Sequence, residues 1–66
     1  MAFEFKKGDR VIGNDKNPTF NGRIGTVSYV SGADYWVKFD DNETVEGGIH
    51  GWWLEPLAAG ARSAAA

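Results

Sequence analysis

The sequence predicts an all-β fold in which five short antiparallel strands close into a small barrel. Apolar and polar residues alternate in short runs, and clusters of turn residues separate these runs. The chain holds nine glycines and two prolines, a balance typical of turns and bent strands. No stretch keeps a helical period beyond one turn. Short strands joined by short loops indicate a barrel, and a two-sheet meander too short to close is the alternative.

The first expected strand is residues 9–12, and a loop rich in Gly, Asn, Asp and Pro follows at residues 13–22. The second expected strand is residues 23–30. Gly25 lies inside it and permits a sharp bend, so that one strand can serve both sides of a barrel. Residues 31–34 then form a hairpin loop.

The third expected strand, residues 35–39, has the most regular alternation in the chain. Trp36 and Lys38 fall on one face of it. The other face is apolar and forms the expected core, together with Val27 of the second strand: Tyr35, Val37 and Phe39. The indole of Trp36 is therefore expected on the outer surface.

The last part of the fold is expected to be less regular. Residues 40–43 form an acidic turn, and a fourth strand begins at residues 44–46. The pair Gly47-Gly48 interrupts or bulges this strand. Residues 51–54 suit a short 3-10 turn, and the last strand is residues 54–57, where a proline fits an edge position.

Composition limits both the domain organisation and the chemistry. Of the 66 residues, 3–57 form one expected domain, and 58–66 are an Ala-rich segment expected to be a disordered tail or a cloning remnant. The absence of cysteine and the single histidine exclude the usual zinc sites, so we expect neither a metal nor a cofactor. No apolar run is long enough to span a membrane and no signal peptide is visible, so a cytoplasmic location is expected.

Four segments, residues 5–11, 22–27, 35–39 and 53–57, together resemble the SH3-like barrels, which include KOW, Tudor-like and related bacterial and phage domains. The Gly-x-x-Gly-x-Val stretch at residues 22–27 is similar to the centre of a KOW motif. The resemblance covers about residues 5–57 and implies a five-stranded SH3-like barrel. Because this barrel hosts many unrelated activities, its function has to be argued from side chains.

The layout also resembles the plasmid-borne type II dihydrofolate reductases, which share Phe-x-x-Gly-Asp-Arg-Val and a Leu-Glu near the end. In that family a tetramer forms a pore, and a Val-Gln-Ile-Tyr segment binds folate and the nicotinamide cofactor. The equivalent segment lies near residues 45–49, where only Val45 and Ile49 match and the glutamine and tyrosine are missing. Glu46 stands there instead, and its charge disfavours two anionic ligands.

Catalytic residues are not expected. Asp40-Asp41 fits a solvated turn better than a metal pair, and no serine has a visible base beside it. The most informative side chain is Trp36, an outward indole beside the Lys38 cation. The adjacent Trp52 and Trp53 cannot both face a core, so we expect Trp53 to plug one end and Trp52 to be exposed.

The function predicted from these residues is a small non-enzymatic binding module whose aromatic surface contacts another protein or a second copy of the chain. The residues of this surface are Trp36, Tyr29, Trp52 and Lys38. One alternative is a KOW-like, RNA- or ribosome-associated domain that uses the basic residues of the first third of the chain: Lys6, Lys7, Arg10, Lys16 and Arg23. The net charge of −2 argues against this alternative. The other alternative is an oligomeric enzyme similar to the type II reductases.

Overall fold

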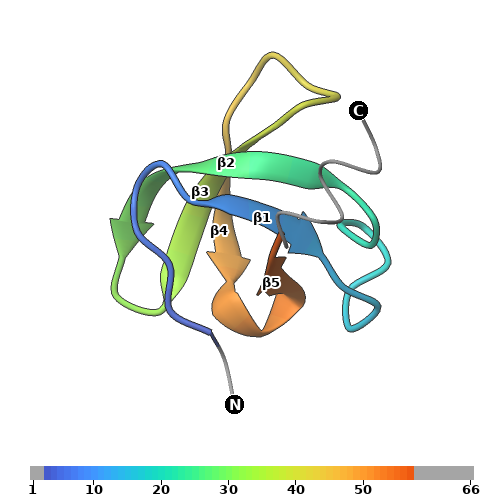
Figure 1. Cartoon of the computed structure of the whole chain (residues 1–66), viewed down its shortest axis with the longest axis horizontal. Coiled ribbons are helices and arrows are strands. Elements are labelled where there is room, and N and C mark those ends of the chain that lie inside the picture. The colour runs from blue at the N-terminus through green and yellow to red at the C-terminus, as the bar shows by residue number, and fades with distance from the viewer. Residues whose placement is uncertain (1–2, 58–66) are drawn as a thin grey trace.

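The computed structural model describes residues 3–57, which form five strands and one 3-10 turn (Figure 1). In chain order the elements are β1 (Arg10–Gly13), β2 (Ile24–Ser31), β3 (Asp34–Phe39), β4 (Glu46–His50), the 3-10 turn η1 (Gly51–Trp53) and β5 (Leu54–Pro56). No α-helix occurs among the described residues, so none there is long and apolar enough to cross a membrane. The prediction of an all-β fold with a 3-10 turn before the last strand is confirmed. The expected tail at residues 58–66 lies outside the described residues.

The strands form one antiparallel sheet in the order β4-β3-β2-β1-β5. The last strand returns to pair with the first, so that Val11 lies opposite Pro56. This order leaves β4 and β5 at the two edges, with η1 joining them. Pro56 therefore lies in an edge strand, as predicted, where its missing N–H costs the sheet little.

Strand β2 is the longest and pairs with β1 on one side and β3 on the other. At Gly25 the backbones come unusually close, because a side-chain carbon there would overlap the backbone oxygen of Lys38 and a methyl group of Val37. Glycine at this position is thus required by the close approach of β3.

Strand β4 begins at Glu46, two residues later than expected. The Thr44 amide donates instead to the Asn42 side chain at 3.1 Å, which extends the acidic turn. The expected interruption at Gly47-Gly48 is confirmed: the register between β3 and β4 shifts there, and Gly48 has a φ of 70°. This backbone is typical of a glycine bulge.

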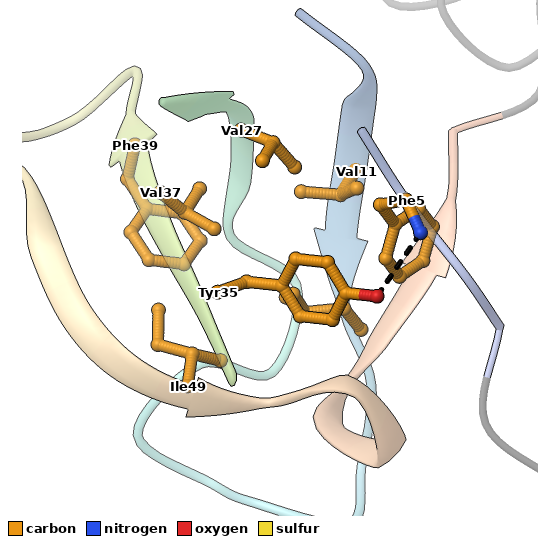
Figure 2. Close-up of a cluster of buried hydrophobic side chains, with 8 residues drawn as sticks. Phe5, Val11, Val27, Tyr35, Val37, Phe39 and Ile49 are labelled. Atoms are coloured by element: carbon orange, nitrogen blue, oxygen red, sulfur yellow. Dashed lines mark hydrogen bonds between the residues drawn. The ribbon is translucent and has the colours of Figure 1, made fainter. Parts of the chain in front are cut away.

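The core is formed by one side chain from the N-terminal segment and by inward-facing residues of all five strands (Figure 2). These residues are Phe5, Val11, Val27, Tyr35, Val37, Phe39, Ile49 and Leu54. The expected core face of β3 is confirmed, since its burial alternates strictly along the strand. The Tyr35 hydroxyl oxygen accepts a hydrogen bond from the Phe5 amide at 3.1 Å, so this buried polar group is satisfied (Figure 2).

Aromatic rings extend the core at one end. Phe20, from the long loop between β1 and β2, stacks on Phe39 with ring centroids 5.7 Å apart and on Trp53 at 5.9 Å. Trp53 packs against the core in a partly buried position, as expected for the inner residue of the Trp52-Trp53 pair. A chain without disulfides thus obtains much of its buried area from rings.

Phe39→Ala tests the core. The ring is fully buried and contacts Phe20, so its loss should lower the free energy of unfolding by about 3–5 kcal/mol, a large part of the total for so small a domain. Urea denaturation measures this change. Phe3→Ala, at a side chain 49% exposed, is the matched control and should cost about 1 kcal/mol or less. Equal losses for the two variants would contradict this core.

Candidate partner-binding surface

Tyr29 and Trp36 lie directly opposite each other on the outer face of β2 and β3. Their ring centroids are 5.5 Å apart and their planes meet at 78°, an edge-to-face contact that stabilises such pairs by about 0.5–1.5 kcal/mol. Tyr29 is 60% exposed, while Trp36 is partly buried. We call these two residues the aromatic pair.

A bulge in β2 brings the pair together. The register between β2 and β3 shifts between Val27 and Tyr29, so Ser28 is an extra residue without a partner in β3. With regular alternation from the buried Val27, Ser28 would lie opposite Trp36 and Tyr29 would point to the core side. The bulge at Ser28 instead places the Tyr29 ring on the outer face, opposite Trp36.

The indole of Trp36 lies against the backbone of Gly47 in the neighbouring strand β4. Any side-chain carbon at Gly47 would overlap the indole ring atoms Nε1, Cδ1 and Cε2. The ring is therefore held between Tyr29 on one side and bare backbone on the other, and both Gly47 and Gly48 are exposed. Within the described part of the chain, the indole N–H donates to no acceptor.

The structure brings together three of the four predicted surface residues. Lys38 shares the outer face of β3 with Trp36, and its ammonium donates to the Phe39 carbonyl oxygen at 3.0 Å. Trp52 is 56% exposed, as expected, but its ring contacts His50 at 5.2 Å and lines a hollow with Lys16. Among residues 3–57 no ring contact joins Trp52 to the aromatic pair.

The two arginines among the predicted RNA contacts are held by carboxylates. Arg10 makes a two-pronged ion pair with Asp40, with N–O distances of 2.9 and 2.7 Å. Lys6 lies 3.4 Å from Asp9 within one turn. Lys7 and Lys16 are exposed. The charges of the two arginines are thus largely matched inside the fold, which leaves a weaker basic surface than the sequence implies.

Arg23 lies at the centre of a cluster that the sequence analysis missed. Its guanidinium sits 4.2 Å from the ring centre of Phe39 and bonds Asp41 at 3.0 Å and also Glu46. Asn42 donates to the same Glu46 carboxylate at 3.1 Å. The hydrogen bonds from Arg23 hold the pKa of both carboxyl groups below their ordinary values. The acidic turn is exposed to solvent, as expected, and the cluster also ties it to the end of the core.

Neither a metal-binding group among the described residues nor a known relative adds to this description of the surface. Across the described residues, no three His, Asp or Glu side chains gather in a group that could hold a metal ion. Comparison of the chain with protein-family models, with curated proteins and with solved structures found no match. The case for a function therefore rests on the side chains described above, of which the aromatic pair is the most distinctive.

The Arg23 cluster predicts a pH dependence of stability. A carboxyl group whose pKa is lowered in the folded state stabilises the fold above its unfolded pKa, near 4, and this contribution is lost as the pH falls through the folded pKa. Arg23→Met keeps the apolar stem and removes the charge. The difference in unfolding free energy between wild type and this variant should be largest near neutral pH and shrink below about pH 4.

Urea denaturation at a series of pH values measures that difference. Because Asp41 is 59% exposed at its side chain, water screens its pairing and the effect should be modest. Lys7→Met, at an exposed lysine, is the control and should show no such trend. A difference for Arg23→Met that stays constant with pH would rule out the ion pairs as its cause.

Proposed function

We propose that this chain is a small non-enzymatic binding module of the SH3-like barrel type, and that it contacts a partner protein through the outer face of β2 and β3. The strand order and the 3-10 turn before β5 support the barrel type. The observation that carries the proposed function is the aromatic pair, Tyr29 and Trp36, held edge to face on an open sheet surface.

The pair is suited to binding because its orientation is already fixed. Trp36 packs between Tyr29 and Gly47, so little side-chain entropy is lost when a partner covers it. Trp and Tyr are enriched among the residues that dominate binding energy. The exposed glycines beside the indole let a partner approach the backbone closely, and the indole N–H offers a hydrogen-bond donor.

The ion pairs of the two arginines favour a protein partner over the two alternatives. An RNA-binding role would need free cations, whereas Arg10 and Arg23 are paired with carboxylates and the net charge is −2. A reductase-like role would need a ligand-binding segment near residues 45–49. There the Glu46 carboxylate is bonded to Arg23, and two of the neighbouring positions are glycines.

Trp36→Ala tests the surface. A display library of extended peptides, with Pro-rich segments included, should yield ligands that bind the wild-type chain, since exposed aromatic side chains suit such segments. Trp36→Ala should leave the fold intact and weaken binding by about 2 kcal/mol or more, or roughly 30-fold in Kd. Trp52→Ala is the matched control, because it removes the same side chain at an exposed position that lies apart from the pair.

Isothermal titration calorimetry measures the affinities, and circular dichroism checks the fold. A library that yields no ligand, together with a chain that does not self-associate, would contradict the proposal. Ligands that depend on Trp52 and not on Trp36 would place the binding surface elsewhere.

Gly47→Ala tests whether the indole must be held in place. The added methyl group overlaps the Trp36 ring, and the ring can move because it is the end of a side chain. We therefore expect a stability loss of only about 1 kcal/mol but a clear loss of binding. In a Trp36→Ala background, Gly47→Ala should have little further effect on either quantity, and a double-mutant cycle measures that coupling. Additive effects would show that Gly47 acts independently of Trp36.

A further inference from the structure

We propose that the surface carrying the aromatic pair binds a second copy of this chain, in a two-fold symmetric dimer whose two β3 strands lie face to face and antiparallel. This inference rests on the proposed function and names its partner. It follows from the order of charges along the outer face of β3, which is self-complementary.

The outer face of β3 presents an acid, an aromatic ring and a base in order: Asp34, Trp36 and Lys38. Successive outward residues of a strand are about 6–7 Å apart, so the two charges are spaced equally on either side of the indole. A two-fold axis in the plane of the interface, perpendicular to β3, reverses the strand of the second copy. Each Asp34 then lies opposite the Lys38 of the second copy, and the two Trp36 rings meet at the centre.

The neighbouring charges of this face are already satisfied, which makes these two stand out. Arg10 and Asp40 pair with each other, and the Lys38 ammonium also helps to lower the pKa of the Asp40 carboxyl, although its distance from Asp40 is beyond that of an ion pair. In the part of the chain that the structure describes, no ion pair joins Asp34 or Lys38 to another residue. The bond from the Lys38 ammonium to its neighbour's carbonyl is a weak competitor, since a small rotation exchanges it for a carboxylate.

The arrangement gives the usual anatomy of an interface, with rings at the centre and charges at the rim. The register places Tyr29 beside Trp36, so four aromatic rings gather around the two-fold axis. Sheets packed face to face are turned by about 30°, which shifts the charged positions by only about 3 Å, within the reach of the lysine stem. The surface proposed to meet the second copy involves only β2, β3 and β4, so the area buried is small and the dimer should be weak. The charges at its rim should set the orientation of the two copies.

Charge reversal tests the antiparallel arrangement. Asp34→Lys and Lys38→Asp each place like charges opposite one another, so each variant alone should have its dimer dissociation constant raised by about tenfold or more at low salt. An equimolar mixture of the two variants pairs two lysines with two aspartates and should associate again. The double variant, Asp34→Lys with Lys38→Asp, should also self-associate, because its pattern is simply reversed.

Sedimentation equilibrium over a concentration series measures these constants, and circular dichroism verifies that each variant is folded. Glu43→Lys and Lys7→Asp are the matched controls: they make the same charge changes at exposed positions outside β3 and should leave the dimer intact. Where a reversal unfolds the chain, the neutral variants Asp34→Asn and Lys38→Gln replace it and should weaken the dimer less strongly.

The outcomes separate this inference from the function on which it rests. A wild-type chain that stays monomeric up to about 1 mM, while peptides still bind through Trp36, would overturn the dimer and leave the binding module standing. A dimer that Trp36→Ala disrupts but that the mixed variants do not restore would overturn the antiparallel arrangement. A dimer and peptide ligands that are both indifferent to Trp36→Ala would overturn the inference and the proposed function together.

Discussion

Strand β3 lies between β2 and β4, and its alternating side chains organise both the core and the outer surface. Tyr35, Val37 and Phe39 fill the interior, which leaves the residues between them no position but the outside. A chain this small, without disulfides, cannot give up three large buried side chains. The exposed row of β3 is therefore fixed by the requirements of the core, and the aromatic pair is built upon it.

Two bulges convert that row into a candidate binding surface. The bulge at Ser28 turns Tyr29 outward beside Trp36, and the bulge at Gly47-Gly48 provides bare backbone on the other side of the indole. Each bulge interrupts regular pairing and lowers the local order of the sheet. The result is a large ring with a defined orientation on an open face, which a regular three-strand sheet would not hold in this way.

The charged side chains have a different task on this chain. Arg23 covers Phe39 while it binds Asp41 and Glu46, and so closes one end of the core with charge rather than with further apolar area. Arg10 and Asp40 form a second such pair. The two arginines are thus engaged within the fold rather than free to meet a phosphate.

Much of the fold could be predicted from the sequence, because alternation and turn chemistry are local properties of the chain. The five strands, the core face of β3, the 3-10 turn and the interruption at Gly47-Gly48 all follow from residues close together in sequence. The outward position of Trp36 follows in the same way, since it is the immediate neighbour of two core residues.

Only the tertiary structure decided the rest, because it depends on which segments lie side by side. Tyr29 faces outward because β2 bulges against β3, and no local pattern marks Ser28 as the extra residue. The Trp52 ring packs against His50 and not against the aromatic pair, because Trp52 lies in the turn η1. Arg23 meets Asp41 and Glu46 across 18 and 23 positions of sequence, a pairing that composition and charge order cannot specify. Alternation along each strand determined which side chains face the core, and contacts between strands determined which side chains are neighbours on the outer surface.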